Sequence, residues 1–416
     1  MPTRAVAGQI TAPPSKAQTH RALFTALFAK GSTRIINPLR CDDTNATERA
    51  VTALGARISG SVILTVSSDG ALKRPREIID CGESGVTMRF VIPILSLIGD
   101  ETVLKAEESL IQRPIEPLVD ALKQLNVSLS VKDRTVTVSG GPAEGGTVTV
   151  RGDVSSQFIS GLLLAGTLMK KGIKLEVVSP LESRNYVLLT IETLRRHGVN
   201  VNVSRDFSLF EVPSGQKPKP ATDEISGDYS SASYHLCAAA ITESSLTVNN
   251  LSQTLEPDSV IVNLLSRMGV KTNVIGNSVI VEGGKLKVTD VDIRECPDLG
   301  PIIAVLACYA DGGTTRITGA RRLRYKESDR LASIRSELVS LGGKVIETED
   351  GLVLSSPVTL TGGIVQSHND HRIAMALSIA ALGAKNEVTI RGAECVNKSY
   401  PSFFEDLRSI GVHVVG

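Results

Sequence analysis

The sequence predicts a mixed α/β (α+β) protein in which six copies of one unit form two similar lobes. Three observations predict it: a turn signal that recurs with a regular period, a series of apolar helices with the same period, and strands that separate and follow the helices. A chain of 416 residues is also too long for one compact core, so two or three domains are expected.

The turn signal is a Gly or Asn that ends a helix just before a strand. It occurs at intervals of 71, 72, 71, 73 and 69 residues, at Gly55, Asn126, Gly198, Gly269, Gly342 and Gly411. Gly and Asn are the residues that best tolerate a positive φ, which a left-handed helix C-cap requires. The pattern therefore predicts a helix end at each of these six positions.

Small apolar helices form the second series. They are expected to begin near Ser15, Gly85, Ser155, Ser230, Pro297 and Asn369. Because these helices are apolar almost all round, they are predicted to be buried inside the lobes. The strands expected between the two helices of each unit are 32–36, 102–105, 173–177, 245–248, 314–317 and 387–390. The strands expected to close the first five units are 63–66, 135–138, 209–212, 279–281 and 352–354.

The sixth unit ends without a closing strand, and residues 3–11 form a strand with no unit of its own. We therefore expect the N-terminal strand to complete unit six. The predicted lobes are then residues 13–226, with units one to three, and residues 1–12 plus 227–416, with units four to six. The chain would cross twice between the lobes, near residues 13–15 and 213–227, and two such connections would form a hinge.

Composition excludes several classes of function. Lys plus Arg (45) nearly balance Asp plus Glu (44), so the net charge of +1 gives no overall attraction to nucleic acid or anionic lipid. The apolar runs are too short for a membrane span, and the first residues do not resemble a secretory signal. A cytoplasmic protein is expected. The six Cys form no CxxC pair, which predicts reduced, buried thiols. His368 and His371 lack further ligands, so no metal is expected.

Cations concentrate at the predicted helix starts, where unpaired N–H groups already favour anions. They are Lys16, Arg21, Arg113, Lys326, Arg330, Arg372 and Lys398. If the three units of each lobe pack with pseudo-threefold symmetry, these positions converge, and a cationic cleft for phosphate and carboxylate groups is expected. Asp298 and Glu327 lie among the cations. Because negative groups weaken an anion site, they suggest proton transfer.

Each of these residues also has an ordinary structural interpretation. Asp42, Asp228, Ser230 and Asp370 are more simply helix caps. Lys326, Asp329 and Arg330 could equally form a solvated helix face. A repeat scaffold that only binds partners would explain the six units, but it would have no use for two carboxylates among the cations.

Ten segments along the whole chain resemble the EPSP synthase (3-phosphoshikimate 1-carboxyvinyltransferase) family of enolpyruvyl transferases. They are residues 14–22, 83–89, 112–115, 155–158, 183–186, 227–234, 297–299, 326–330, 369–375 and 398–401. The most specific are Lys-Glu-Ser-Asp-Arg (326–330) and Asn-Asp-His-Arg (369–372). The resemblance implies two hinged lobes, each an inside-out α/β barrel of three βαβαββ units. It also implies the reaction of shikimate 3-phosphate with phosphoenolpyruvate to 5-enolpyruvylshikimate 3-phosphate and phosphate, without a cofactor.

The resemblance further implies roles for individual residues. Asp298 would be the base toward the 5-hydroxyl, and Glu327 and Lys16 would handle protons at C3 and at the leaving group. The residues implied to hold shikimate 3-phosphate are Lys16, Arg21, Ser155, Ser156, Gln157, Ser183, Tyr186, Asp298 and Lys326. The residues implied to hold phosphoenolpyruvate are Lys16, Gly85, Arg113, Gln157, Arg330, Arg372 and Lys398. These small molecules are the only partners expected, and the protein is expected to be a monomer.

Three positions depart from the family pattern. Ala17 replaces a Ser, so one contact to shikimate 3-phosphate is lost or comes from Thr19. Glu83 adds a negative charge before Gly85, and Arg322 adds a cation shortly before Lys326.

The resemblance leaves related activities to distinguish. A sister enzyme that transfers enolpyruvate to UDP-N-acetylglucosamine normally has a reactive Cys before the segment at 112–115. Residues 106–113 contain no Cys. An RNA-terminus enzyme of related fold is disfavoured by the neutral net charge and the few aromatic residues.

Overall fold

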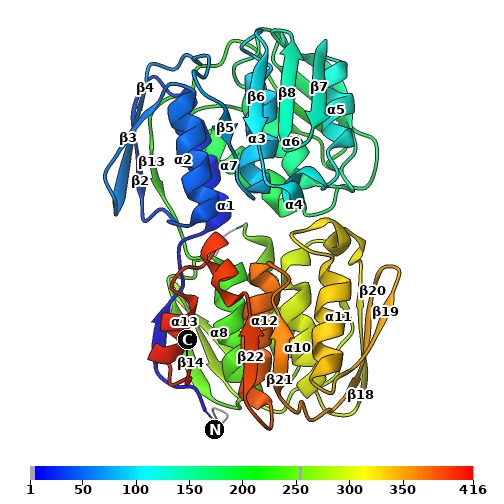
Figure 1. Cartoon of the computed structure of the whole chain (residues 1–416). Helices are drawn as coiled ribbons and strands as arrows, with labels where there is room; N and C mark the ends of the chain where they lie inside the picture. Colours follow the sequence, from blue (N-terminus) through cyan, green and yellow to red (C-terminus); the bar gives the residue numbers. More distant parts are fainter. Residues whose placement is uncertain (1–4, 253–254, 416) are drawn as a thin grey trace. The chain divides into compact units, whose positions relative to one another are not determined.

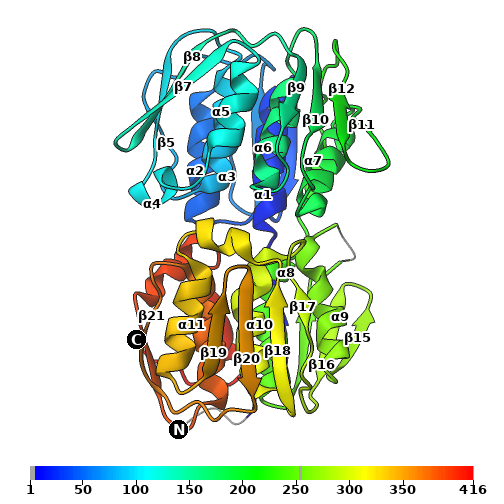
Figure 2. The same cartoon turned by 90° about the vertical axis from the view of Figure 1, so that its right-hand side faces the viewer.

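The computed structural model describes residues 5–252 and 255–415. The chain divides into two compact lobes. The N-terminal lobe is Pro14–Ile225, and the C-terminal lobe combines Met1–Pro13 with Ser226–Gly416. In each lobe, helices lie inside and small sheets lie outside (Figures 1 and 2). The hinge expected at the two connections stays a prediction.

Three four-stranded sheets form the outside of the N-terminal lobe. The first has the order β13–β2–β4–β3, with bounds Thr222–Glu224, Gly31–Ile36, Ile63–Ser68 and Arg57–Ser59. The second has the order β5–β6–β8–β7, with bounds Ile79–Asp80, Thr102–Lys105, Thr135–Gly140 and Val127–Lys132. The third has the order β9–β10–β12–β11, with bounds Gly146–Val150, Ile173–Val177, Leu209–Val212 and Asn202–Val203.

The helices of this lobe come in pairs, one pair for each sheet, with one short extra helix. The first helices of the three pairs are α1 (Lys16–Phe28), α3 (Gly85–Leu95) and α6 (Ser156–Gly166). The second helices are α2 (Asp42–Ala53), α5 (Glu116–Lys123) and α7 (Arg184–Arg196), and the short α4 spans Glu108–Ile111.

The C-terminal lobe repeats this plan, and its described residues form two four-stranded sheets and one sheet of two strands. The first has the order β1–β14–β16–β15, with bounds Gln9–Thr11, Ser245–Asn249, Ser278–Glu282 and Lys271–Ile275. The second has the order β17–β18–β20–β19, with bounds Val291–Asp292, Gly313–Thr318, Gly351–Ser356 and Lys344–Thr348. The third pairs β21 (Gly363–Gln366) with β22 (Val388–Arg391).

The helices of the C-terminal lobe also come in pairs. The first helices are α8 (Tyr229–Ile241), α10 (Gly300–Tyr309) and α12 (His371–Ala380), and the second are α9 (Val260–Arg267), α11 (Arg330–Ser340) and α13 (Phe403–Ser409). Five 3₁₀ turns flank them: η1 (Pro257–Ser259), η2 (Pro297–Leu299), η3 (Arg321–Tyr325), η4 (Ala381–Gly383) and η5 (Ala393–Lys398).

Every sheet begins with a short strand that runs parallel to its neighbour, whereas the other pairs are antiparallel. The parallel pairs are β13–β2, β5–β6, β9–β10, β1–β14, β17–β18 and β21–β22. A complete unit therefore reads strand, helix, strand, helix, strand, strand, as a βαβαββ unit requires. The fold class is confirmed.

The prediction that the N-terminal strand completes unit six is wrong. Within the described part of residues 3–11, only Gln9–Thr11 form a strand, and Gln9 pairs in parallel with Thr247 of β14 in unit four. β1 forms the edge of the sheet of unit four, where it runs parallel to β14. Unit six keeps a two-stranded sheet among the described residues, and a groove of about 740 Å³ opens beside β22 and α13.

The predicted helix ends are confirmed at all six positions. Asn126 has a φ of 59°, and the five Gly residues have φ between 76° and 118°. The helix before each of them therefore ends with a left-handed residue, which a β-branched side chain would not tolerate.

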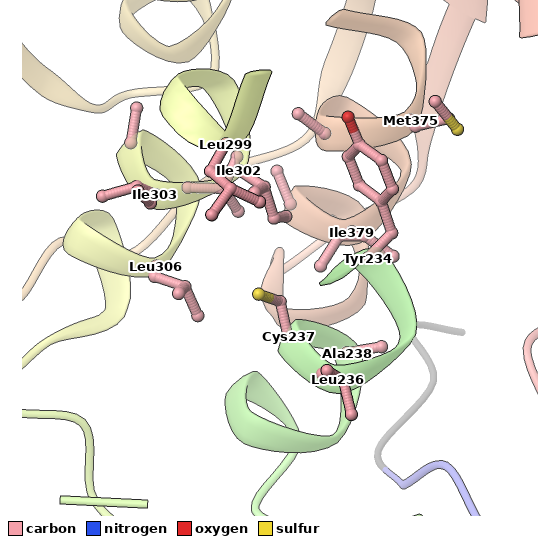
Figure 3. Close-up of a cluster of buried hydrophobic side chains, with 14 of the residues drawn as sticks. Tyr234, Leu236, Cys237, Ala238, Leu299, Ile302, Ile303, Leu306, Met375 and Ile379 are labelled. Atoms are coloured by element: carbon pink, nitrogen blue, oxygen red, sulfur yellow. The ribbon is translucent and has the colours of Figure 1, made fainter. Parts of the chain in front are cut away.

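Apolar helices form the core of each lobe, as their composition predicts. In the C-terminal lobe, side chains of α8, α10 and α12 meet, among them Leu236, Ile302, Leu306 and Ile379 (Figure 3). In the N-terminal lobe, α1 and α3 meet through the rings of Phe24 and Phe90, whose centroids are 5.7 Å apart. Because the first helices of the units pack together, their starting residues are brought to one end of each lobe.

The structure also bears on two exclusions drawn from composition. All six Cys are buried free thiols, as predicted. Within residues 5–252 and 255–415, no helix combines the length and apolar character that crossing a membrane requires.

Candidate active site

Serine caps start the three inner helices of the N-terminal lobe. Ser15, Ser84 and Ser155 each accept a hydrogen bond from a backbone N–H of the first turn. Such caps leave other N–H groups of the first turn facing outward, next to Lys16, Gly85 and Ser156. The polar residues predicted for the site therefore follow directly from where these helices begin.

Lys16 and Arg21 lie on the first turns of α1. Lys16 Nζ is 2.8 Å from Asp43 Oδ2 of α2. Arg21 is 2% exposed, and its nitrogens donate to Thr190 Oγ1 and to the carbonyls of Ala17 and Tyr186, each at 2.8 Å. The guanidinium also lies over the Tyr186 ring. The structure thus joins Arg21 and Tyr186, two of the residues implied to bind shikimate 3-phosphate.

Gly85 lies between two buried guanidinium groups. A Cβ at this position would be 3.4 Å from Nη1 of both Arg113 and Arg89. Arg89 Nη1 in turn donates to Gln157 Oε1 at 2.8 Å. The structure therefore brings together Gly85, Arg113 and Gln157, three residues implied to bind phosphoenolpyruvate.

Arg89 belongs to this group although the sequence analysis assigned it no role. It is 8% exposed, and its guanidinium lies 5.4 Å from the centre of the Phe158 ring. The signal that could have found it is its spacing: four residues after Gly85, one helical turn later, it points to the same side of α3.

Ser183 adopts a left-handed conformation, with a φ of 55°, immediately before α7. A non-Gly residue rarely takes this conformation, and such residues are common at functional sites. Ser183 is 2% exposed, and its carbonyl accepts a hydrogen bond from the Tyr186 N–H.

Two of the family departures fall in this lobe. Thr19 does not supply the contact expected from the residue at Ala17, because its hydroxyl is fully buried, donates to the Ser15 carbonyl and accepts from the Leu39 N–H. That alternative is therefore wrong. Glu83 accepts a hydrogen bond from Ser109 Oγ at 2.9 Å, so its carboxylate is engaged within the lobe.

Arg330 is the centre of an ion-pair network in the C-terminal lobe. It is 1% exposed, so the alternative prediction that it lies on a solvated helix face is wrong for this residue. Its nitrogens lie 2.8 Å from Asp370 Oδ2, 2.9 Å from Asp298 Oδ1 and 2.5 Å from Glu327 Oε2. One guanidinium therefore holds three carboxylates, including both that were predicted to transfer protons.

Asp298 lies in the 3₁₀ turn that leads into α10, and three cations surround it. Besides Arg330, Lys326 Nζ lies 3.3 Å and Arg372 Nη2 lies 3.4 Å from its carboxylate. Burial alone would raise the pKa of Asp298, but the charges of Lys326, Arg372 and Arg330 outweigh it and hold the pKa well below its ordinary value. Asp298 is thus ionised and can accept a proton.

Arg372 follows the cap residue Asp370 at the start of α12 and is 5% exposed. Its Nη2 contacts Asp298, and its side chain also interacts with the buried Tyr234 hydroxyl of α8. Arg372 therefore places a buried positive charge beside Asp298.

Lys326 and Lys398 complete the predicted cations. Burial and the charges of Arg330 and Arg322 lower the pKa of Lys326 and outweigh the opposite effect of Asp298 and Glu327. Arg322, the third family departure, is buried and donates to the Arg294 carbonyl at 2.5 Å. Lys398 Nζ donates to the Asn369 carbonyl at 2.6 Å, next to the start of α12.

The predictions of helix caps have mixed outcomes. Asp228 and Asp370 cap α8 and α12 as predicted, but Asp370 also binds Arg330, so it is more than a cap. Ser230 is not a cap, since its hydroxyl donates to the buried Asp258. Among the described residues, no group of three or more His, Cys, Asp or Glu is arranged to hold a metal ion.

Comparison with known proteins agrees with this geometry. The family model "EPSP synthase (3-phosphoshikimate 1-carboxyvinyltransferase)" matches residues 1–407. The chain belongs to the EPSP synthase family. A 3-phosphoshikimate 1-carboxyvinyltransferase of Methanocorpusculum labreanum is 39% identical over 98% of this chain and 96% of its own length. That of Natronomonas pharaonis is 40% identical, over 98% and 97%.

Solved EPSP synthase structures share the fold as well. An EPSP synthase from Acinetobacter baumannii superposes with a TM-score of 0.82 at 27% identity, covering 98% of this chain and 96% of the other. The two-lobed repeat architecture derived from the sequence is therefore that of the EPSP synthase family.

Proposed function

We propose that this protein transfers the enolpyruvyl group of phosphoenolpyruvate to the 5-hydroxyl of shikimate 3-phosphate, releasing phosphate. The observation that carries the proposal is Asp298, a carboxylate held ionised by Lys326, Arg330 and Arg372. The reaction needs a base at a hydroxyl group next to cations that bind a phosphate and a carboxylate, and this cluster supplies both.

In the proposed addition step, Asp298 accepts the proton of the 5-hydroxyl while the oxygen of that hydroxyl bonds to C2 of phosphoenolpyruvate. C3 receives a proton at the same time, from Glu327 or Lys16. In the elimination step C3 loses a proton again, the bond from C2 to the phosphate oxygen breaks, and phosphate leaves. The products are 5-enolpyruvylshikimate 3-phosphate and phosphate, so the atoms balance without a cofactor.

The low pKa of Asp298 makes it a weak base while the cations face it alone. When an anion binds the same cations, it offsets part of their charge, so the pKa of Asp298 should rise toward its ordinary value. The base would then gain strength only when phosphoenolpyruvate is bound, which ties the chemistry to the presence of both substrates.

The remaining roles are those that the family resemblance implies. We propose that Arg113, Gly85, Gln157, Arg330, Arg372, Lys398 and Lys16 bind phosphoenolpyruvate. We propose that Arg21, Tyr186, Ser155, Ser156, Ser183, Gln157, Lys16, Lys326 and Asp298 bind shikimate 3-phosphate. Arg330 already holds three carboxylates, so it would have to share its nitrogens with the ligand.

A phosphate-release assay tests the proposal. The protein mixed with shikimate 3-phosphate and phosphoenolpyruvate should release phosphate and form one equivalent of the enolpyruvyl product. Omitting either substrate is the control. Turnover with UDP-N-acetylglucosamine in place of shikimate 3-phosphate, and none with shikimate 3-phosphate, would assign the sister activity instead.

A further inference from the structure

The turn that leads into α12 contains two left-handed residues in succession. His368 and Asn369 each have a φ of 54°. This conformation is uncommon for residues other than Gly, although His and Asn tolerate it better than most. Two such residues side by side persist only where the surrounding structure holds them, and such backbone is common at functional sites. The contacts of this turn therefore decide how the start of α12 is kept in place.

Glu337 of α11 supplies two of these contacts. Its Oε2 accepts a hydrogen bond from the Gln366 N–H at 3.0 Å, and its Oε1 lies 2.7 Å from His368 Nε2. A solvated ion pair would contribute little, but Glu337 is only 7% exposed and one of its partners is a backbone N–H. Since a carboxylate only accepts hydrogen bonds, the second contact requires a proton on Nε2 of His368.

The same helix also holds the far end of the turn. Arg330 begins α11 and binds Asp370, the residue that follows the turn and caps α12. Arg330 and Glu337 are seven positions apart, about two helical turns, so they lie on the same face of α11. α11 therefore holds the turn on both sides, with an arginine at one end and a glutamate at the other.

The turn carries groups of the candidate site. The Asn369 carbonyl accepts a hydrogen bond from Lys398 Nζ at 2.6 Å. If the backbone left the left-handed region, this carbonyl would point elsewhere and Lys398 would lose the hydrogen bond. Arg372, which contacts Asp298, lies in the first turn of α12 and would shift with the start of that helix. The conformation of the turn therefore affects two of the predicted cations.

We propose that Glu337 is a positioning residue for the cations of the C-terminal lobe that bind phosphoenolpyruvate. It holds the turn that orients Lys398 and starts the helix of Arg372, and it touches no substrate itself. The inference rests on the proposed function, which assigns phosphoenolpyruvate to these cations. The ordinary alternative is that Glu337 only stabilises the lobe. Its loss would then lower the stability of the protein and leave substrate binding unchanged.

Steady-state kinetics of Glu337→Ala distinguishes these two roles. Both contacts to the turn are lost, so the KM for phosphoenolpyruvate should rise about tenfold, which corresponds to about 1.4 kcal/mol. The KM for shikimate 3-phosphate should change far less, because most of its proposed contacts lie in the N-terminal lobe. Asp290→Ala is the control in the same lobe. Asp290 also accepts a backbone N–H, that of Arg316 at 2.8 Å, but it is exposed and holds two strands.

Glu337→Gln tests whether the contacts matter rather than the charge. The amide oxygen can accept from the Gln366 N–H, and the amide NH₂ can donate to His368 Nε2 once the ring carries its proton on Nδ1. In alkaline buffer, where imidazole is ordinarily neutral, Glu337→Gln should therefore keep a KM close to that of the wild type. An unchanged KM for phosphoenolpyruvate in Glu337→Ala, or an equal rise in Asp290→Ala, would overturn the positioning role.

Amide hydrogen exchange of the same variants needs no turnover. Residues 366–372 should exchange faster in Glu337→Ala than in the wild type, whereas Glu337→Gln and Asp290→Ala should leave their exchange unchanged. Unchanged exchange of residues 366–372 in Glu337→Ala would show that Glu337 does not hold the turn, and the inference would fail. A wild-type protein that releases no phosphate would overturn the proposed function instead, because the exchange result does not depend on the reaction.

Discussion

Arg21 and Arg89 of the N-terminal lobe contact neutral acceptors, whereas Arg330 and Arg372 of the C-terminal lobe contact carboxylates. In the N-terminal lobe, Arg21 donates to a hydroxyl and two carbonyls, and Arg89 donates to an amide and a carbonyl. Both also lie over aromatic rings, Phe90 and Phe158. In the C-terminal lobe, Arg330 and Arg372 donate to carboxylates.

This difference suggests that the arginines of the N-terminal lobe serve anion binding, whereas the carboxylates of the C-terminal lobe can also serve proton transfer. The acceptors seen at Arg21 and Arg89 are neutral, so they do not themselves offset the positive charge that attracts an anion. The positive charges of Lys16 and Arg21 act with burial to hold the pKa of His20 well below its ordinary value. In the C-terminal lobe the carboxylates offset the cations, so we expect an anion to share these cations with the carboxylates.

The largest effect is expected where a carboxylate of the C-terminal lobe is removed. Asp370→Ala takes from Arg330 a buried ion pair and from α12 its cap. The free energy of unfolding should fall by about 3 kcal/mol, from the loss of the cap and of the charged hydrogen bonds to Arg330, which keeps Asp298 and Glu327. Chemical denaturation measures the loss.

Asp329→Ala is the control for Asp370→Ala. Asp329 caps α11, but its side chain is 38% exposed, so its removal should cost only about 1 kcal/mol. Similar losses in the two variants would show that the ion pair with Arg330 adds nothing beyond the cap.

The next largest effect concerns the candidate base. Asp298→Asn should lower kcat by at least about a hundredfold, because the amide cannot accept the hydroxyl proton. The affinity for phosphoenolpyruvate should not fall, since the three cations lose a competing negative charge. Steady-state kinetics with the phosphate-release assay separates the two parameters. Asp292→Asn, on an exposed ion pair with Arg294, is the control, and a near-normal kcat in Asp298→Asn would remove the residue from this role.

A smaller effect tests the N-terminal lobe. Arg89→Leu should raise the KM for phosphoenolpyruvate about tenfold, the loss of about 1.4 kcal/mol expected for one charged hydrogen bond. Because Gln157 and the Pro114 carbonyl, which accept from Arg89, do not titrate, the pH profile of kcat should keep its shape. A shifted pH profile would contradict the contrast between the lobes. Arg74→Leu, on an exposed arginine, provides the baseline.

The smallest effect is expected at Gly85. Its φ is not positive, so Ala fits the backbone, and Gly85→Ala should stabilise the protein by about 0.4–1 kcal/mol. The added Cβ would stand 3.4 Å from Nη1 of both Arg89 and Arg113, in the space proposed for the ligand. The KM for phosphoenolpyruvate should therefore rise several-fold while thermal stability increases. An unchanged KM would place the ligand elsewhere.

Local features of the fold could be predicted from the sequence because they depend on neighbouring residues. The strands at 102–105 and 173–177 coincide with β6 and β10, and the six left-handed helix ends follow from Gly and Asn alone. Apart from the strand expected at 3–11, the short first strands of the units were not predicted. β5 has only two residues, and β13 lies where a linker was expected, so neither carries a pattern of its own. Which strand β1 joins depends on a residue far along the chain.

Contacts between distant segments could not be predicted for the candidate site either. The sequence places cations at helix starts, and the structure confirms that the helices begin there. That Arg330 holds three carboxylates could not be predicted, because Asp298, Glu327 and Asp370 come from three different segments.

The parallel pair β1–β14 has a consequence for the order in which the protein can be made. The N-terminal lobe is one continuous segment, and its last strand, β13, joins the sheet of its first unit. β1 is synthesised before that lobe, but its partner Thr247 follows Gln9 by 238 positions. At about 5–20 residues per second, β1 waits on the order of 10–50 s on the ribosome for its sheet. Its pairing edge is three residues long, which limits the chance that it joins another chain in the meantime.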